Sequence, residues 1–427
     1  MPCRCLVTSI VLAHAAGQPA SPLKLSVEMH DLKDLGAWLQ SNEPAHEMLT
    51  PSTLPDPCFT LDGREHVSFS TNNYLALANS PRLKARARQA LDRYGVGNCE
   101  SRLLGGNLAL YETLEARLAA VKGKESALIF ATGYLTNLGV LTALVRTGQL
   151  ARAFGYRTRT RWTHEYFSDE FNHVSIREGI RVSGATSLSY RHLDMNDLER
   201  KLKASNASIR IIATDGVFSQ HGDIVPLPEM LEVAERYDAF IYIDDAHGTG
   251  VLGSTGCGTT EHFGVSSPRI IHMGTLSKAY GCIGGFVATD EHITRILRLG
   301  CPAFGFTSTL PPDQAAAVIE AIDIVREEPE RRMRLWENQR HFVDRMLASS
   351  FDLTATETPI VPLVIGDEGE CARLAAGLRA VGIHVDAIMF PAVPVGQSRL
   401  RFIMNAHHTV EHIDRVVATL QTLVSSG

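Results

Sequence analysis

Lys278 stands at the tip of a polar turn between two apolar runs, where a lysine could do chemistry. The surrounding segment, 269–288, reads RIIHMGTLSKAYGCIGGFVA and holds hydroxyls and glycines where a solvated loop usually mixes charges. Burial of an amine lowers its pKa and frees its lone pair for nucleophilic attack. The segment alone fits two interpretations, a buried Schiff-base lysine and a surface lysine in a glycine-rich loop, so the rest of the chain must decide.

Further polar residues stand where other apolar, strand-like runs end. The candidates, in chain order, are Thr132-Gly133-Tyr134, His173, Ser219, and the pair Asp244 and His247. An acid followed three residues later by a histidine can hold one heterocycle at two points, and the N–H groups at a helix start suit a phosphate. Each motif alone is equally compatible with the capping of a turn or helix. Because they follow successive strands and precede Lys278, together they predict one site.

These residues can meet only if the strands before them lie in one sheet. Strand-like runs alternate with helical periodicity, which predicts a mostly parallel α/β sheet with helices on both faces. The expected strands are 126–131, 165–168, 187–190, 209–214 and 240–243, and 269–288 predicts a strand, a tight turn and a strand. Ligands of such sheets bind at the carboxyl ends of the strands, where the candidates stand.

A second α/β pattern after the Pro311-Pro312 pair predicts a smaller C-terminal domain, which opens with one long helical region at about 313–348. Residues 43–65 read as a connecting arm. The expected units are 1–28, a disordered or targeting extension; 29–70, a helix and arm that pack with the small domain; 71–310, a large cofactor-binding domain; and 311–427, the small domain.

Composition bounds the classes of function. The 427 residues are 44% hydrophobic and 21% charged with a net charge of −6, which is typical of a globular protein and points to neither a nucleic acid nor a membrane. No stretch approaches the roughly 20 apolar residues of a membrane span. The eight cysteines are scattered, which indicates reduced thiols. We therefore expect a cytoplasmic protein, with organellar targeting by residues 1–27 as the alternative.

Three local patterns compete with this interpretation. The basic insertion 147–164 could contact nucleic acid, although a solvated surface insertion is the interpretation we favour. Residues 248–253 fit the dinucleotide pattern G-x-G-x-x-G, but no helical pattern follows them. Residues 408–412 fit the metalloprotease pattern H-x-x-E-H. Thr409 is the better N-cap of the last helix and would leave His408 outside it, so we expect no metal site there.

With these residues in hand, the chain from about Phe69 to Leu423 resembles the α-oxoamine synthases, pyridoxal-phosphate enzymes of the aspartate-aminotransferase fold (fold type I). The segment 275–281 is similar to the family's Schiff-base motif around the lysine. The resemblance implies that Asp244 holds the pyridine nitrogen, that His247 holds the 3′-oxygen, and that His173 stacks on the ring. It adds Ser219 near the 3′-oxygen.

The resemblance also implies further contacts around the cofactor. Its phosphate would be held by Thr132, Gly133, Tyr134 and Thr275, and by Thr307 and Ser308 reaching across a homodimer interface. The substrate would lie near Asn72 and Tyr74, and Arg401 would take the amino-acid carboxylate, with Arg399 on the same strand face as the fallback. No metal is implied.

The activity that the resemblance implies is an acyl transfer (class EC 2.3.1). A small amino acid (alanine, glycine or serine) condenses with an acyl-CoA or other acyl thioester, CoA leaves and, in most members, CO₂ is lost, which gives an α-amino ketone. The alternatives are another fold-type-I reaction, such as transamination or condensation without decarboxylation, and a non-catalytic partner subunit. The chain departs from the family at Glu100 and Leu103, and Leu103 favours an apolar acyl chain over a succinyl donor.

Overall fold

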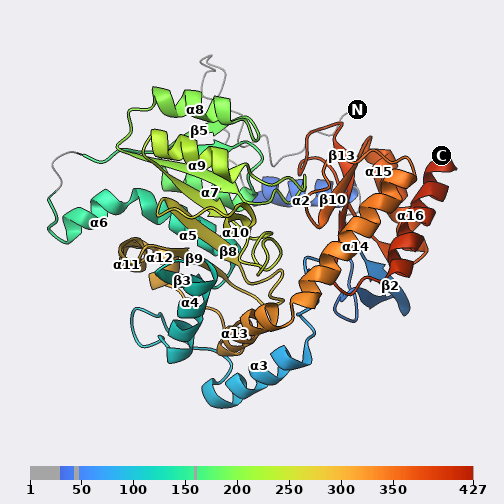
Figure 1. Ribbon diagram of the computed structural model, residues 1–427, viewed down its shortest axis with the longest axis horizontal. Coiled ribbons are helices and arrows are strands. Elements are labelled where there is room, and N and C mark those ends of the chain that lie inside the picture. Colours follow the sequence, from blue (N-terminus) through green and yellow to red (C-terminus); the bar gives the residue numbers. More distant parts are fainter. Residues whose placement is uncertain (1–28, 43–47, 158–160, 427) are drawn as a thin grey trace.

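A computed structural model describes residues 29–42, 48–157 and 161–426, so the expected extension at 1–28 lies outside the described residues (Figure 1). Its centre is a seven-stranded sheet in the order β3-β9-β8-β7-β6-β4-β5. The strands are β3 (Ser126–Phe130), β4 (His164–Asp169), β5 (Thr186–Tyr190), β6 (Ile209–Asp215), β7 (Ala239–Asp244), β8 (Ile270–Thr275) and β9 (Gly285–Thr289). Only β9 runs against its neighbours, which confirms the mostly parallel sheet.

Helices cover both faces of this sheet, because side chains alternate along each strand and both sets are apolar. On β4, for example, Tyr166 packs with one face and Phe167 with the other. The first face is covered by α5 (Gly133–Val145), α7 (Val174–Ser183), α11 (Glu291–Gly300) and α12 (Pro302–Gly305). The second is covered by α8 (Met195–Ala204) and α9 (Leu227–Arg236), with α10 (Thr259–Phe263) against α9.

The lysine turn is the connection of an antiparallel strand pair inside the sheet. β8 and β9 pair from His272↔Ala288 to Thr275↔Gly285, and every residue of both strands is buried. The predicted strand, turn and strand are therefore confirmed. Since both neighbours of the turn are held in the core, the turn has a fixed position at the edge of the sheet.

The C-terminal part repeats the alternation that the sequence predicts. A three-stranded sheet in the order β10-β13-β12 packs with α15, and α16 packs with α14 (Pro329–Ala348) and α15. The elements are β10 (Ile360–Gly366), α15 (Glu368–Ala380), β11 (Ile383–His384), β12 (Asp386–Ile388), β13 (Ser398–Ile403) and α16 (Val410–Ser425). Thr409 is the N-cap of α16 and forms a capping box with His412, so His408 lies outside the helix as expected.

Two expectations about elements are wrong. The long helical region is two helices, α13 (Pro312–Glu327) and α14 (Pro329–Ala348), because Pro329 has no N–H to continue the first and starts the second. The connecting arm contains β1 (Cys58–Leu61), and β2 (Arg64–Ser68) begins inside it. β2 also pairs in parallel with β11, so this part of the chain does pack with the C-terminal elements.

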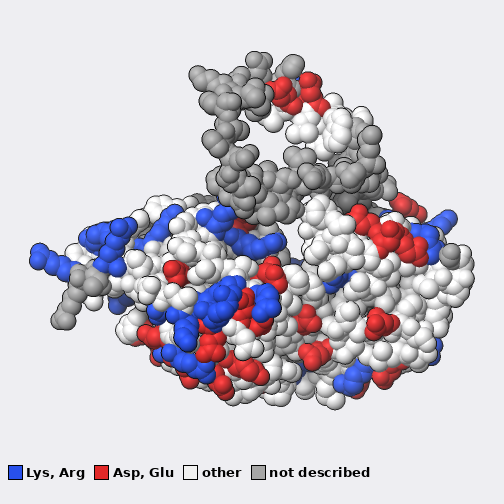
Figure 2. All heavy atoms as spheres, turned by 90° about the horizontal axis from the view of Figure 1, so that it is seen from above, with Lys and Arg blue, Asp and Glu red and all other residues white. Residues whose placement is uncertain are grey.

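The remaining helices are α2 (Met29–Asn42), α3 (Pro81–Tyr94), α4 (Ala109–Val121) and α6 (Thr147–Ala153). α6 is the first part of the basic insertion and extends to one side of the molecule (Figure 1). In Figure 2 basic side chains gather toward the left of the face, with acidic side chains beside them. Arg236 and Glu199 form one of the ion pairs among the described residues. No described helix is both long and apolar enough to cross a membrane.

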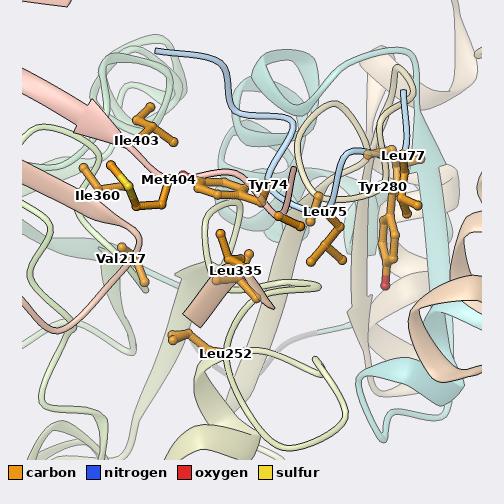
Figure 3. Close-up of a cluster of buried hydrophobic side chains, with 14 of the residues drawn as sticks. Tyr74, Leu75, Leu77, Val217, Leu252, Tyr280, Leu335, Ile360, Ile403 and Met404 are labelled. Carbon is orange, nitrogen blue, oxygen red and sulfur yellow. The ribbon is translucent and has the colours of Figure 1, made fainter. Parts of the chain in front are cut away.

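A hydrophobic cluster joins the large sheet to the C-terminal elements. In Figure 3 Tyr74 and Leu75, from the segment after β2, lie near Leu335 of α14, while Leu77 of the same segment and Ile403 at the end of β13 lie on opposite sides of them. All five side chains are at most 1% exposed. The segment 74–77 is therefore fixed between the two parts of the molecule.

Candidate functional site

A cavity of about 280 Å³ opens at the carboxyl ends of the central strands. It is lined by nine of the predicted residues, from five different segments of the chain: Thr132, Gly133, Tyr134, His173, Ser219, Asp244, His247, Thr275 and Lys278. Parallel strands bring their carboxyl ends to one edge, so residues far apart in sequence meet there. The structure thus brings the strand-end candidates together as the sequence predicts.

Lys278 is half-buried in the cavity wall, which rules out the surface-loop interpretation. Its Nζ lies 2.8 Å from His247 Nε2. Burial lowers the pKa of the Lys278 amine from 10.5 to about 8, although the carboxylates of Asp244 and Asp215 act in the opposite direction. A large fraction of the amine is therefore unprotonated at mildly alkaline pH and available as a nucleophile.

His247 is buried between the lysine and a tyrosine. Its Nδ1 lies 2.7 Å from the hydroxyl of Tyr74, whose ring packs in the cluster of Figure 3. Burial and the positive charge of Lys278 lower the pKa of His247 well below its usual value, so the ring is neutral. Burial raises the pKa of Tyr74 above its usual 10, so the phenol keeps its proton. Tyr74 thus positions His247 but is not part of the cavity lining.

Asp244 ends β7 and is 4% exposed. Its Oδ1 accepts a hydrogen bond from Ala246 N at 3.0 Å, and its Oδ2 accepts one from Asn137 Nδ2 at 2.7 Å. The neighbouring acid Asp215 ends β6 and accepts a hydrogen bond from the main-chain N–H of His173 at 2.7 Å. Burial and the charge of Asp244 raise the pKa of Asp215 well above its usual value.

The part of the cavity wall at the start of α5 is suited to binding an anion. Thr132 is the N-cap of α5 and accepts a hydrogen bond from Leu135 N, so the positive end of that helix faces the cavity. A Cβ on Gly133 would lie 3.0 Å from Thr275 Oγ1, so glycine permits the close approach of helix and strand. Thr275 Oγ1 also lies 2.8 Å from Ser277 Oγ, which adds a second hydroxyl.

The two candidate arginines on β13 do not line this cavity. Arg401 pairs with Asp386 (Nη2–Oδ2, 2.9 Å) and donates to the Ser219 carbonyl at 3.3 Å, while its buried Nε has no partner among the described residues. Arg399 donates to the carbonyls of Gln220 and Gln397. Arg401 also acts on the pKa of Lys278 and His247, which places its charge nearer the lysine than that of Arg399.

Four other residues singled out from the sequence also lie outside the cavity lining of this one chain, namely Asn72, Leu103, Thr307 and Ser308. Asn72 has a buried Oδ1 without a hydrogen-bond partner among the described residues. Thr307, which follows α12, donates its hydroxyl to the Ser308 carbonyl. Leu103 packs beside Gly305 of α12.

The sequence-based interpretation missed four polar residues of the lining: Asn137, Ser175, Asp215 and Ser277. Asp215 had a usable signal, because it directly follows a predicted strand, as Asp244 does. Ser175 and Ser277 stand within two residues of predicted site residues. Asn137 had none, because it lies one turn inside an apolar helix and its inward direction depends on how α5 packs.

The lining fits a phosphorylated heterocyclic aldehyde. The lining combines a helix N-terminus and hydroxyls that suit an anion, a buried carboxylate, and an amine of lowered pKa. Pyridoxal 5′-phosphate carries a phosphate, a ring nitrogen that pairs with a carboxylate, and an aldehyde that reacts with an amine. The donors therefore match the groups of this cofactor.

Comparison with known proteins agrees with the site. The aminotransferase class I and II family matches residues 64–420. 8-Amino-7-oxononanoate synthase 1 of Bacillus velezensis is 39% identical over 399 residues, 93% of this chain and 96% of that protein. A serine palmitoyltransferase of Sphingomonas wittichii is 28% identical, with a TM-score of 0.83 over 95% of this chain and 99% of that chain. Another serine palmitoyltransferase, solved with pyridoxal phosphate, also has a TM-score of 0.83, with 28% identity over 92% of this chain and 96% of that chain. The chain therefore belongs to the aminotransferase class I and II family, in its α-oxoamine synthase branch, whose cofactor is pyridoxal 5′-phosphate.

Proposed function

We propose that this chain condenses a small α-amino acid with an acyl thioester, releases the thiol and CO₂, and so makes an α-amino ketone. The observation that carries the proposal is the position of Lys278, an amine of lowered pKa inside a cavity that also offers a carboxylate and an anion seat. A non-catalytic subunit would not need this lysine. The similarity to an 8-amino-7-oxononanoate synthase favours acyl transfer over transamination.

Lys278 is the covalent anchor of the cofactor and the proton carrier. When bound, pyridoxal phosphate supplies an electron sink for the pair left at the substrate Cα. In this proposal the carboxylate of Asp244 would hold the ring nitrogen, His247 would hold the 3′-oxygen with Ser219 nearby, and His173 would stack on the ring. Once the substrate has displaced it, the amine of Lys278 removes a proton from Cα and later returns one. Its pKa of about 8 suits both directions near neutral pH.

The phosphate is held at the start of α5. Thr132, Gly133 and Tyr134 supply the helix N-terminus, and Thr275 supplies a hydroxyl beside it. Thr307 and Ser308 act in the second subunit of a homodimer, in which each chain completes the other's phosphate site. Their position outside the cavity of their own chain supports this assignment.

The amino-acid substrate is held from the side of β13. Arg401 binds the carboxylate, because its Nε is unpartnered among the described residues and its charge reaches Lys278. Arg399 is the weaker candidate, since carbonyls of the chain already accept its hydrogen bonds. Asn72 offers a buried amide oxygen that has no hydrogen-bond partner in the described part of the chain, and Tyr74 acts through His247.

The test uses the purified chain reconstituted with pyridoxal phosphate. Alanine, glycine and serine are each paired with acyl-CoAs from short to long, and thiol release is followed with a thiol reagent. Carboxyl-labelled amino acid reports loss of CO₂ in the same reaction. We expect thiol and CO₂ in equal amounts with one amino acid preferred. Formation of a keto acid without thiol release would show a transaminase instead.

Alanine with a seven-carbon, ω-carboxylated acyl thioester is the pair to try first. The name 8-amino-7-oxononanoate describes an amine-bearing two-carbon end, as decarboxylated alanine supplies, joined to a seven-carbon acid. Serine with a long acyl-CoA is the second pair, because the structural neighbours are serine palmitoyltransferases. A thiol-release rate that is higher for serine than for alanine would reverse this order.

A further inference from the structure

A buried hydrogen-bond chain behind the cavity joins Asp244 to His173 through one amide. Asn137, on the inner side of α5, is 1% exposed, and both polar atoms of its side chain are engaged. Its Nδ2 donates to Asp244 Oδ2 at 2.7 Å and to Ser175 Oγ at 2.8 Å, while its Oδ1 accepts from the Tyr242 hydroxyl at 2.7 Å. Ser175 Oγ in turn lies 2.7 Å from His173 Nδ1. All of these groups are thereby satisfied inside the protein.

Asp244 and Tyr242 together orient the Asn137 amide, because a carboxylate oxygen accepts and therefore faces the NH₂ group, which leaves Oδ1 toward the phenol. Burial raises the pKa of the Tyr242 phenol well above its usual value, so the phenol keeps its proton and donates it to Asn137 Oδ1. The amide is then oriented with Nδ2 toward the serine, and an NH₂ group can only donate. Ser175 Oγ therefore accepts from Asn137 and directs its own proton to His173 Nδ1.

A second donor meets the same nitrogen. The main-chain N–H of Ser175 points at His173 Nδ1 from 3.3 Å, which leaves Nδ1 as an acceptor only. Burial lowers the pKa of His173 below its usual value, so the ring is neutral and carries one proton. That proton must then be on Nε2, the ring nitrogen that does not face Ser175.

We propose that Asn137 is a positioning residue that fixes His173 as the Nε2–H tautomer and holds the Asp244 carboxylate with the other hydrogen of the same NH₂ group. His173 thereby presents a hydrogen-bond donor, and not an acceptor, on the side away from Ser175. The use of that donor in acyl transfer rests on the proposed function, but the tautomer itself does not.

The tautomer is measured on the cofactor-free protein, by ¹⁵N NMR of histidine-labelled chain near pH 7.5. The His173 signals are those missing from the spectrum of His173→Gln. We expect a protonated Nε2 and an unprotonated, hydrogen-bonded Nδ1 in the wild-type chain. A protonated Nδ1 would overturn the proposal at once, and this outcome does not depend on any variant of Asn137 folding.

The variant Asn137→Asp keeps the shape of the side chain but removes the NH₂ group, so whether ionised or protonated it cannot donate to both Asp244 and Ser175 Oγ. Ser175 Oγ must then turn its proton toward Asp at 137, so we expect His173 to shift in large part to the Nδ1–H tautomer or to the imidazolium. The matched control is Asn338→Asp, a buried amide on α14 that donates to the carbonyls of Asn405 and His408 outside the cavity. Unchanged His173 signals in Asn137→Asp, with the fold intact by circular dichroism, would contradict the proposal.

The loaded enzyme gives the second readout, once the wild-type chain has shown thiol release. Loss of a group that orients a site residue typically costs on the order of 10–100-fold. We expect Asn137→Asp to lower kcat by that factor with little change in KM for the acyl thioester, and Asn338→Asp to leave kcat within about twofold. If the wild-type chain shows no acyl transfer, the proposed function is wrong, but the tautomer result is unaffected. If Asn137→Asp shifts the tautomer of His173 and leaves kcat unchanged, the positioning role is wrong.

Discussion

The two sides of the site are built in different ways. On the cofactor side, nine predicted residues meet in one cavity because each stands at, or shortly after, the carboxyl end of a strand of the same sheet. On the substrate side, Asn72, Tyr74, Arg399 and Arg401 come from a segment and a strand outside that sheet, and none of them lines the cavity. The cavity lining on the cofactor side therefore comes from one sheet and its connections, whereas the substrate side depends on how separate parts pack.

The largest effect should come from the cofactor side. Replacing Lys278 by Ala removes the nucleophile and the proton carrier, so we expect kcat to fall by at least about 10³-fold, in the range of lost general-base catalysis. Borohydride reduction followed by mass spectrometry should show the cofactor mass on a peptide with Lys278 and none in the variant. Residual activity within tenfold of wild type would show that this side is not where the chemistry occurs.

The next test compares the two arginines on β13. Arg401→Gln removes a charge-assisted hydrogen bond worth about 1.5–3 kcal/mol, so KM for the amino acid should rise by roughly 10–150-fold. The matched variant Arg399→Gln should change KM less than about threefold, because its contacts are carbonyls of the chain. Steady-state kinetics at saturating acyl thioester measures both. The opposite ranking would make Arg399 the carboxylate ligand.

A third test measures, without any substrate, how much stability the chain loses by burying the amine of Lys278. The pKa of Lys278 is lowered from 10.5 to about 8 in the folded, cofactor-free chain, so folding there disfavours the protonated amine. The unfolded chain binds this proton first as pH falls from 10.5, so stability is lost between pH 10.5 and 8 and the penalty is complete below 8. Lys278→Met should therefore be more stable than wild type by about 1–3 kcal/mol at pH 7.

The difference between the two chains should shrink as pH rises from 8 to 10.5, because both states then lose the proton. Urea unfolding of the two cofactor-free proteins across this range measures it. A difference that does not depend on pH would mean that the gain comes from packing and not from the charge of Lys278.

The smallest effect concerns Asp386, which pairs with Arg401 and is about one-third exposed. Asp386→Asn keeps the shape but removes the negative charge that competes with a substrate carboxylate. Since such partly exposed pairs are worth about 0.2–1 kcal/mol, KM for the amino acid should fall by roughly 1.5–5-fold. Spectral titration of the loaded enzyme with amino acid measures it. A rise in KM would show that Asp386 is needed to orient the guanidinium.

The same contrast explains what the sequence could predict. Asp244, His247 and Ser219 follow apolar runs whose type and order are readable, and the parallel sheet then forces them together. The inward direction of Asn137 depends on the packing of α5, which local periodicity does not contain. Pro329 was a readable helix break that the interpretation of 313–348 passed over.

The position of the arginines could not be read either, since alternation along β13 shows only that Arg399 and Arg401 share a face. Which of them has free donors depends on Asp386 of β12 and on the loop after β6. β1 was missed because it is four residues long and pairs with a strand next to it, without the apolar run that marks the central strands.

The pairing of β2 with β11 also has a consequence for biosynthesis. Val67 pairs with Ile383, nearly at opposite ends of the described chain. A ribosome adds about 5–20 residues per second, so the nascent β2 waits roughly 15–60 s for its partner while the central sheet can already form. A chain that stops before residue 383 would carry an unpaired strand edge with the apolar Val67 on it. Premature termination should therefore yield a species that chaperones retain or proteases remove.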